Sequence, residues 1–578
     1  MTVPNRATLW GRVIVDELAA SGVEQVCLVS GSRSTPLSVA AAEHDSIQTY
    51  PHLDERSAAF FALGRARRTS EPVALVCTSG TAGANFHPAV IEAHQSRVPL
   101  VVLTADRPAE LQDSGANQTI DQSSLYGDAV RYSRTLPEPA PEARRLRSVR
   151  TTVCRAVGQT TGTYSGPVHL NVPFAKPLEP TPVTDDVPTD FGERAPDALN
   201  GRDGPYVRTT SGAPVLDESA LATIADAIRG ADHGLIVAGP VNEPSPSEGA
   251  LVDLARATGY PVFADPLSGH RFGPVDHGLI CGGYDGYIER LEAGPTPDVV
   301  LRFGASPTSK PLRKYLRDVD ARSLLVDPAG QWREAEFTGT DHIIADETSV
   351  ARELAARCSQ SSSEFTEAMI QAEQEYWTAM EPALDSATFE GSIAAAVVDA
   401  LPDPSTLYVS NGMPVRDVDR FARPRAADIT VLGNRGASGI DGMPSSVLGA
   451  ADAVDEPVVG LLGDLAFLHD VNGLAAIDRF DVNATLVVIN NDGGGIFHKL
   501  PIASFDPPFT DLFKTPHGLD LAATGSLYGF QFDRVSGVEA LQAAVERSIE
   551  SDGTQVIEIK TDAAESHRRR ESLAEETP

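Results

Sequence analysis

Polar residues follow two apolar runs in the last third of the chain. Gly463 and Asp464 directly follow the run VVGLL. Asn491 comes directly after TLVVIN, in the string NNDGGG. Asp464 and Asn491 are 27 residues apart, about one strand–helix–strand crossover, so we expect them at the same edge of a parallel sheet. A carboxylate, an amide oxygen and a backbone carbonyl suit Mg²⁺, which prefers oxygen ligands. The glycines allow the backbone to approach a diphosphate closely.

Asp, Asn and Gly are also ordinary turn residues, so two strand-end turns are the alternative interpretation of this spacing. The pair resembles the diphosphate–Mg²⁺ signature of thiamine diphosphate enzymes. That resemblance implies thiamine diphosphate and Mg²⁺ as cofactors, with Mn²⁺ as an alternative metal. It also implies three α/β domains in the order pyrimidine-binding, central and diphosphate-binding.

The pyrimidine half of the cofactor needs a glutamate in the first domain. Glu55 stands at the expected place, just before the apolar helical run SAAFFAL. The resemblance implies that Glu55 hydrogen-bonds the aminopyrimidine N1′ and so promotes loss of the thiazolium C2 proton. Taken alone, Glu55 is an ordinary acidic residue at a helix N-terminus. The family places this cofactor between subunits, so we expect a homodimer or a homotetramer.

Longer strings narrow the resemblance. They are SGSRSTPL (30–37), TSGTAGAN (78–85), LTADRPAEL (103–111), GANQTIDQ (115–122), RFGASPTSKP (302–311), NGMPVRDVD (411–419) and NRGASGIDG (434–442). Together they resemble the 2-succinyl-5-enolpyruvyl-6-hydroxy-3-cyclohexene-1-carboxylate synthases, transferases of menaquinone biosynthesis. That resemblance implies condensation of 2-oxoglutarate with isochorismate and release of CO₂.

The same resemblance implies the site residues. The catalytic and substrate-binding set is Glu55, Ser32, Arg33, Arg107, Asn117, Gln118, Lys310, Arg416 and Arg435. The cofactor-binding set is Glu55, Ser438, Ile440, Gly463, Asp464, Leu465, Asn491, Gly493 and Gly494, with Asp464, Asn491 and Gly493 as metal ligands. Both substrates are dianions, and an arginine can bind a carboxylate through two parallel hydrogen bonds. The cations of this set are therefore suited to binding the substrates. Gly412 and Ala466 stand where the family often has Ser.

Two other functions are open. Another thiamine diphosphate-dependent 2-oxoacid decarboxylase, or an acetolactate synthase-like enzyme, would share Glu55, Asp464 and Asn491 but has no need for so many arginines in its motifs. A catalytically inactive paralogue is expected to have lost Glu55 or the metal pair, and both are present. A nicotinamide dehydrogenase is disfavoured because no GxGxxG follows an apolar run.

Short apolar runs must form the sheets that position these residues. The runs alternate with helical patterns, which predicts three doubly wound parallel sheets in an α/β fold. The expected strands are 25–30, 73–79, 100–105 and 168–172, then 235–238, 262–264, 299–303, 324–326 and 343–345, and finally 407–410, 429–432, 458–462, 486–489 and 556–559. A helix is expected over 8–20, with Thr8 as its N-cap.

Composition shifts predict the domain boundaries. We expect a pyrimidine-binding domain over 1–180, a Pro-rich linker over 181–214, a central domain over 215–358, a linker and helix over 359–389 and a diphosphate-binding domain over 390–564. The charged string ESHRRRESLAEETP predicts a flexible tail over 565–578.

The charge balance is unusual: 47 Lys+Arg against 80 Asp+Glu gives a net charge of −33, and only six of the cations are lysines. Such a surface repels nucleic acid and anionic membranes. The scattered acids favour a solvated coat adapted to high salt over a docking surface for a basic partner. Five cysteines without a CxxC indicate neither a disulfide framework nor a zinc site. No signal-peptide pattern or membrane span is visible, so we expect a cytoplasmic protein.

Overall fold

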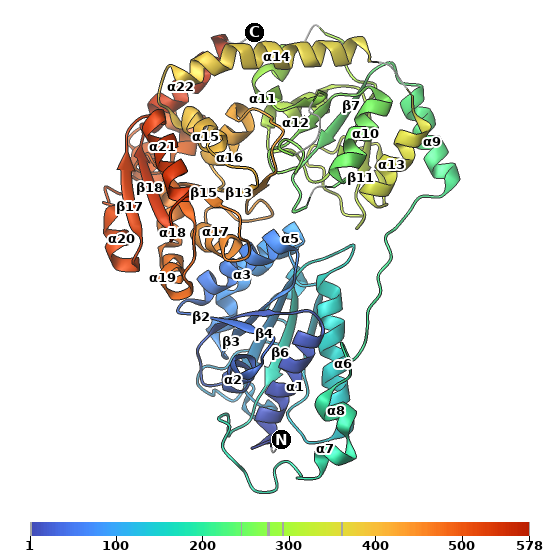
Figure 1. Cartoon of the computed structure of the whole chain (residues 1–578), viewed down its shortest axis with the longest axis vertical. Helices are drawn as coiled ribbons and strands as arrows, with labels where there is room; N and C mark the ends of the chain where they lie inside the picture. Colours follow the sequence, from blue (N-terminus) through green and yellow to red (C-terminus); the bar gives the residue numbers. More distant parts are fainter. Residues whose placement is uncertain (1–2, 244, 274–277, 292–293, 360–361, 577–578) are drawn as a thin grey trace. The chain divides into compact units, whose positions relative to one another are not determined.

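The computed structural model describes residues 3–243, 245–273, 278–291, 294–359 and 362–576 (Figure 1). Over this part of the chain it contains three six-stranded sheets, in which every strand pair is parallel. Buried apolar residues fill both faces of the central strands, as parallel sheets covered by helices require. The predicted fold class is therefore confirmed.

The first sheet has the strand order β2-β1-β3-β4-β6-β5. Its strands are β1 (Gln25–Val29), β2 (Gln48–His52), β3 (Val73–Cys77), β4 (Leu100–Asp106), β5 (Tyr132–Thr135) and β6 (Val168–Pro173). The helices of this part are α1 (Arg6–Ala20), α2 (Thr35–Glu43), α3 (Glu55–Thr69), α4 (Thr81–Asn85), α5 (His87–Ser96), α6 (Ala143–Thr160), α7 (Phe191–Arg194) and α8 (Pro196–Asn200). Helix α1 packs against α2 and α6, whereas α3 packs against α5.

The middle sheet has the order β12-β11-β10-β7-β8-β9. Its strands are β7 (Gly234–Ala238), β8 (Val262–Ala264), β9 (Ile280–Cys281), β10 (Val299–Phe303), β11 (Arg322–Val326) and β12 (Asp341–Ile343). The helices are α9 (Glu218–Arg229), α10 (Glu248–Thr258), α11 (Tyr284–Tyr287), α12 (Lys310–Asp318), α13 (Glu347–Arg357) and α14 (Glu364–Asp385).

The third sheet has the order β14-β13-β15-β16-β18-β17. Its strands are β13 (Ser405–Val409), β14 (Ile429–Leu432), β15 (Val458–Gly463), β16 (Thr485–Asn490), β17 (Gln531–Val535) and β18 (Gln555–Lys560). The helices are α15 (Glu390–Asp399), α16 (Met413–Phe421), α17 (Met443–Ala451), α18 (Asp464–His469), α19 (Ala476–Phe480), α20 (Ala522–Tyr528), α21 (Val538–Ile549) and α22 (Ala563–Glu576).

The first and third sheets have the same topology when each is counted from its own first strand, and the middle sheet differs. Strand β3 therefore corresponds to β15, and β4 corresponds to β16. Ligands in such sheets bind at the carboxyl ends of the strands. Asp106 and Arg107 at the end of β4 thus occupy the place that Asn490 and Asn491 occupy at the end of β16.

The chain forms two compact units, and the first takes in two pieces of later sequence. One unit contains residues 1–211, 434–454 and 470–482, and the other contains 212–433, 455–469 and 483–578. Helix α17 accordingly packs against α3 within the first unit. The loop with Arg435, Ser438 and Ile440 belongs to this unit as well.

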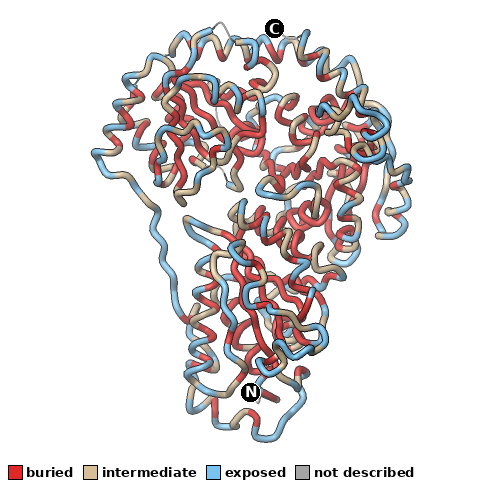
Figure 2. The backbone as a smooth tube through the Cα atoms, turned by 180° about the vertical axis from the view of Figure 1, so that it is seen from behind, coloured by how far each residue is buried: buried red, intermediate tan, exposed pale blue. Residues whose placement is uncertain are grey.

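Most of the predicted linker over 181–214 is fastened to the first unit. Glu17 accepts hydrogen bonds from the Tyr206 N–H and from Arg150, and Arg150 also donates to the carbonyls of Ala198 and Leu199. Residues 181–185 and 207–213 form uninterrupted exposed runs, and exposed residues are pale blue in Figure 2. The buried Glu17–Arg150 pair therefore holds the predicted linker against the first unit as far as Tyr206.

The predicted flexible tail, 565–578, is helical over its described part. Residues 563–576 form the helix α22, whose inward face carries Ala563, Ser566, Arg570 and Leu573. Leu573 is buried in a hydrophobic cluster with Tyr376 and Phe421. The helix is therefore docked and not frayed.

Local features explain the other differences from expectation. Helix α1 is capped by Asn5, whose Oδ1 accepts the Thr8 N–H at 2.9 Å, so Thr8 is not the N-cap. Strands β2, β5 and β17 were missed because they are partly exposed and carry no continuous apolar run. None of the helices in the described ranges has the length and apolar character needed to cross a membrane.

Candidate active site

The carboxyl ends of β15 and β16 bring Asp464 close to the loop that starts at Asn491. The strand register pairs Gly463 with Ile489, so the two chains leave the sheet at the same level. Asp464 is buried, and its Oδ2 accepts the Gly493 N–H at 2.9 Å while its Oδ1 accepts the Leu465 N–H at 2.7 Å. The pairing of strand ends expected from the spacing is therefore present.

Asn491 presents an oxygen that fits a cation. Its Nδ2 donates to Glu390 Oε1 at 2.7 Å. Its Oδ1 is buried and has no hydrogen-bond partner among the described residues. A buried amide oxygen without a partner is costly, and a metal ion at this position would remove that cost. The Gly493 carbonyl accepts the Gly495 N–H at 3.0 Å and keeps a second lone pair.

The glycines after Asn491 permit a close approach of two chain segments. A Cβ on Gly493 would lie 2.0 Å from the Lys514 carbonyl oxygen, and one on Gly494 would lie 2.6 Å from the Phe513 carbonyl oxygen. The φ of Gly493 is +134°, which L-residues rarely adopt. A Cβ on Gly463, by contrast, would have no heavy atom of the described residues within 4 Å, so this turn is open toward a ligand.

His517 is a neighbour of Asp464 that the sequence did not reveal. The Leu519 N–H donates to His517 Nδ1 at 3.0 Å, so Nδ1 carries no proton. The ring proton is then on Nε2, which donates to Asp464 Oδ2 at 3.3 Å. Burial raises the pKa of Asp464, and the N–H groups of Gly493 and Leu465, with His517, work against that rise.

Two arginines at the edge of the first sheet lie close together. Arg33 is buried, and its Nη1 donates to the Phe174 carbonyl at 2.7 Å. Burial lowers the pKa of Arg33, and the neighbouring charge of Arg107 lowers it further. The Nε of Arg107 is buried without a hydrogen-bond partner among the described residues. A buried guanidinium nitrogen without a partner, next to a second arginine, fits an anionic ligand.

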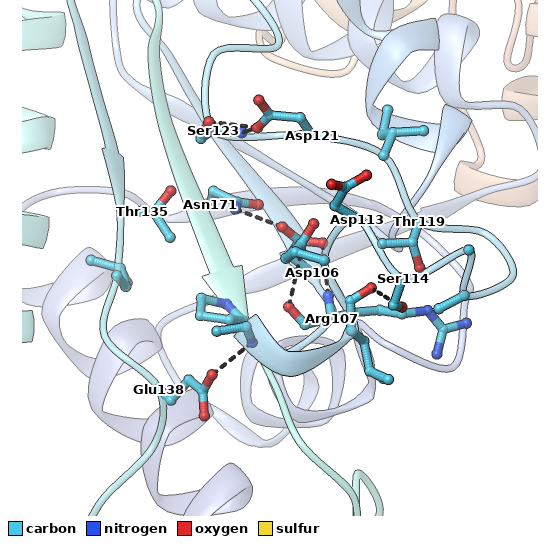
Figure 3. Close-up of a pocket in the computed structure, with 18 residues that line it drawn as sticks. Asp106, Arg107, Asp113, Ser114, Thr119, Asp121, Ser123, Thr135, Glu138 and Asn171 are labelled. Atoms are coloured by element: carbon cyan, nitrogen blue, oxygen red, sulfur yellow. Dashed lines mark hydrogen bonds between the residues drawn. The ribbon is translucent and has the colours of Figure 1, made fainter.

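A cavity of about 750 Å³ lies beside Arg107 (Figure 3). Asp106, Asn171 and Glu138 line it together with the loop over 111–123. Asp106 Oδ1 accepts the Arg107 N–H at 2.7 Å, and Asp106 Oδ2 accepts Asn171 Nδ2 at 2.8 Å. The carboxylates of this cavity outnumber its one arginine, so a dianion needs cations from further residues.

Gln122 organises the loops around this cavity. Its Oε1 accepts the Gly80 N–H at 2.8 Å, and its Nε2 donates to Asn171 Oδ1 at 3.0 Å. Gly80 has a φ of +84° in the TSGTAG turn, so Gln122 holds a turn that only glycine adopts easily. Gln122, Asn171 and Asp106 were missed because the hydrogen bonds that join them to one another and to Gly80 span distant parts of the chain.

Glu55 begins α3, directly after the N-cap Asp54, whose side chain accepts the N–H groups of Arg56 and Ser57. The side chain of Glu55 is half-buried. Gln118 has a φ of +56° and donates from Nε2 to the Ser79 carbonyl at 3.1 Å. Ser32 and Asn117 are exposed. Glu55, Gln118, Ser32 and Asn117 all lie in loops or at a helix start, at the carboxyl edge of the first sheet.

The loop with Arg435 and Ser438 is fixed by a buried glutamate. Glu92 accepts the N–H groups of Gly436, Ala437 and Ser438 at 2.9, 2.6 and 2.9 Å. Nothing in the sequence pairs Glu92 with a loop more than 340 residues away. This carboxylate is a further residue that sequence reasoning missed.

The remaining predicted cations lie in the second unit. Lys310 is exposed at the start of α12, where Ser309 Oγ caps the helix by accepting the Leu312 N–H at 3.1 Å. Arg416 lies on α16 and donates from Nη1 to the Gly412 carbonyl. Gly412 has a φ of +90°, so a serine at this position would be strained. Ala466 is buried in α18.

Two family models and a solved structure resemble this chain. The family model described as thiamine pyrophosphate enzyme, N-terminal TPP binding domain, matches residues 10–125, and the corresponding C-terminal TPP binding domain model matches residues 416–559. The solved structure of benzoylformate decarboxylase from Polynucleobacter necessarius has a TM-score of 0.72 at 19% identity, covering 96% of this chain and 98% of that one. This likeness concerns the fold alone.

Relatives with a curated name match the entire chain. The 2-succinyl-5-enolpyruvyl-6-hydroxy-3-cyclohexene-1-carboxylate synthase of Halobacterium salinarum is 58% identical over 100% of this chain and 99% of its own. Enzymes of the same name from Haloarcula marismortui and Roseiflexus castenholzii are 54% and 45% identical. They cover 100% and 99% of this chain, and 99% and 98% of their own length.

Proposed function

Because the chain belongs to the 2-succinyl-5-enolpyruvyl-6-hydroxy-3-cyclohexene-1-carboxylate synthase family, which is thiamine diphosphate-dependent, we propose that it condenses 2-oxoglutarate with isochorismate and releases CO₂. This reaction serves menaquinone biosynthesis. The observation that carries the proposal is the match of named synthases over the full length of the chain.

We propose that Mg²⁺ is held by Asp464 Oδ1 or Oδ2, Asn491 Oδ1 and the Gly493 carbonyl, with Mn²⁺ as a substitute. The unpartnered, buried Asn491 Oδ1 supports this assignment, as do the oxygen-only donors. The open turn at Gly463, together with Leu465 and Gly494, would receive the diphosphate. Ser438 and Ile440 would contact the rest of the cofactor.

Thiamine diphosphate supplies, when bound, a carbon nucleophile for 2-oxo acids. The chain's own contribution starts with Glu55, which would exchange a proton with the aminopyrimidine N1′. Its position at the first turn of α3 and its half-buried side chain support that role. In the fold family the cofactor lies between subunits, so we propose a homodimer or homotetramer. Exposed Phe505, Leu512 and Leu527 in the third domain give a second copy apolar surface to cover.

The substrates would be bound by Ser32, Arg33, Arg107, Asn117, Gln118, Lys310, Arg416 and Arg435. Both substrates carry two carboxylates, and a chain with a net charge of −33 must concentrate cations locally to attract them. The Arg33–Arg107 pair would supply such a concentration: burial and the charge of Arg107 lower the pKa of Arg33, and Asp106 opposes them. The expected location of the enzyme is the cytoplasm.

A substrate assay tests this proposal. Purified enzyme with thiamine diphosphate and Mg²⁺ is given pyruvate, 2-oxobutyrate, 2-oxoglutarate or benzoylformate, each with and without isochorismate, at low and at molar KCl. We expect CO₂ release from 2-oxoglutarate, coupled to isochorismate consumption. Turnover of pyruvate without any effect of isochorismate would overturn the assignment in favour of a different 2-oxoacid-converting enzyme.

A further inference from the structure

We propose that Glu390, held by Arg570 of the C-terminal helix α22, is a positioning residue of the metal site. It would orient the Asn491 amide so that Oδ1 faces the cation. The inference rests on the proposed Mg²⁺ site and adds two residues outside it. Glu390 and Arg570 lie 101 positions before and 79 positions after Asn491 in the chain.

The hydrogen bond between Asn491 and Glu390 determines which way the amide points. A carboxylate without a proton can only accept hydrogen bonds, so it selects the NH₂ side of an amide. Asn491 Nδ2 donates to Glu390 Oε1 at 2.7 Å, and Thr561 Oγ1 donates to the same oxygen at 3.3 Å. The opposite face of the amide is then Oδ1, which is buried without a partner among the described residues. Asn491 Oδ1, the proposed ligand atom, is therefore oriented without a bound metal.

Arg570 fixes the Glu390 carboxylate in turn. Its Nη2 donates to Glu390 Oε2 at 2.6 Å, and its Nε and Nη2 donate to Asp417 Oδ1 and Oδ2 at 2.7 and 2.6 Å. Glu390 and Asp417 are each 1% exposed and Arg570 is 6% exposed. One guanidinium thus binds both oxygens of Asp417 and one oxygen of Glu390, which leaves the other oxygen of Glu390 for Asn491.

The docking of α22 places Arg570 at this point. Leu573 is fully buried, and Ala563 and Ser566 are buried on the preceding turns, so the helix has one inward face. Asp417 lies on α16, next to Arg416, which is in the proposed substrate set. Arg570 therefore contacts Asn491 indirectly, through Glu390, and contacts the helix that carries Arg416 directly, through Asp417.

Partners that orient metal ligands usually change metal affinity when they are replaced, whereas a purely structural ion pair changes stability alone. Mn²⁺ binding therefore distinguishes the two roles. The experiment titrates the full-length enzyme with Mn²⁺ at saturating thiamine diphosphate, without substrate, in molar KCl, and records free Mn²⁺ by electron paramagnetic resonance. The variants are Glu390→Ala, Glu390→Gln and Arg570→Ala. The matched control is Arg568→Ala, because Arg568 is an exposed arginine on the same helix.

We expect Glu390→Ala and Arg570→Ala to weaken Mn²⁺ binding by about ten- to a hundredfold. Glu390→Gln keeps an acceptor oxygen for Asn491, so its loss should be smaller than that of Glu390→Ala. Arg568→Ala should bind Mn²⁺ like the wild type. Far-ultraviolet circular dichroism without metal checks that each variant is folded, and Arg570→Lys replaces Arg570→Ala if the latter is not.

Asp464→Ala and Asn491→Ala test the metal site itself, independently of the positioning role of Glu390 and Arg570. If both weaken Mn²⁺ binding but the folded Glu390 and Arg570 variants bind like the wild type, the positioning role is wrong and the metal site stands. If Asp464→Ala and Asn491→Ala bind Mn²⁺ like the wild type, the metal site is wrong and the positioning role falls with it.

Discussion

Arg67 donates a hydrogen bond from Nη2 to Glu92 Oε1 at 2.8 Å, and both side chains are buried. Arg67 lies on α3, the helix that begins at Glu55, and Glu92 lies on α5. The same Glu92 carboxylate receives three consecutive N–H groups from residues 436–438. One ion pair thus ties the helix of the proposed N1′ partner to the loop that contains Arg435 and Ser438.

Replacement of Glu92 by alanine should destabilise the fold. It leaves the buried Arg67 without its carboxylate and three backbone N–H groups without an acceptor. Loss of one partner of a buried pair costs about 3–5 kcal/mol in the free energy of unfolding. Denaturant-induced unfolding, followed by circular dichroism, measures the change.

The control is Glu71→Ala, which removes an exposed glutamate just after the end of α3. It should alter the free energy of unfolding by less than about 0.5 kcal/mol. Equal effects of the two substitutions would show that the Arg67–Glu92 pair does not stabilise the loop.

Glu92 also predicts a pH dependence. Burial opposes its ionisation, but Arg67 and the N–H groups of Ala437 and Ser438 outweigh burial and lower its pKa to about 2. The unfolded value is about 4.3. The folded pKa is the lower one, so the stabilisation by ionised Glu92 is fully present above about pH 5 and is lost as the pH falls toward 2.

The free energy of unfolding is therefore to be measured for the wild type and Glu92→Gln between pH 6 and pH 3. The difference between them should shrink as the pH falls below about 4.3, the unfolded pKa of glutamate. A difference that stays constant, or that grows toward pH 3, contradicts the assignment of this low pKa to Glu92.

The meeting of the two strand ends at the proposed metal and diphosphate site was predictable because it depends on local pattern. Apolar runs end in Gly463–Asp464 and Asn490–Asn491, and the register of parallel strands then brings these ends together. The edge strands β2, β5 and β17 were not predictable in this way, since an edge strand is half-solvated and loses the continuous apolar run.

Glu92 and the proposed positioning residue Glu390 could not be predicted from the sequence, for a different reason. Glu92 and Glu390 act through partners that are distant in the chain, and no local spacing encodes such a pair. Helix α22 did carry a signal: Ala563, Ser566, Arg570 and Leu573 recur at intervals of three and four, which is the spacing of one helix face. Because Arg570, a charged residue, lies on that face, the pattern was interpreted as a solvated tail.

Glu55→Gln tests the proton transfer to the aminopyrimidine. Glutamine keeps the size of the side chain but cannot exchange the proton, so we expect hydrogen–deuterium exchange at C2 of thiamine diphosphate to slow by about 10²–10⁴-fold. Rapid quench followed by proton NMR of the released cofactor measures this rate. Thiamine diphosphate binding, measured separately by tryptophan fluorescence, should persist. Exchange within about twofold of the wild type would remove Glu55 from this role.

Arg33→Ala and Arg107→Ala test the anion site of the first unit. Each removes a charge-assisted contact to a dianion, worth about 1.5–3 kcal/mol, which corresponds to about a ten- to a hundredfold loss in kcat/KM. Initial rates over a range of both substrate concentrations measure the loss. Arg147→Ala on α6 is the control, since Arg147 is an exposed arginine. Unchanged kinetics in both variants would exclude this pair from the substrate site.

The acidic surface predicts a requirement for salt. At a net charge of −33 the compact chain repels itself, and this repulsion acts over about 10 Å at 0.1 M salt but over only about 3 Å at 1 M. The temperature of half-unfolding should therefore rise with KCl into the molar range, as a thermal scan at fixed protein concentration will measure. A triple variant with Gln in place of the exposed Glu24, Glu71 and Glu539 should depend less on KCl. A fold that is indifferent to KCl, or destabilised by it, would favour the alternative in which the acidic surface binds a basic partner.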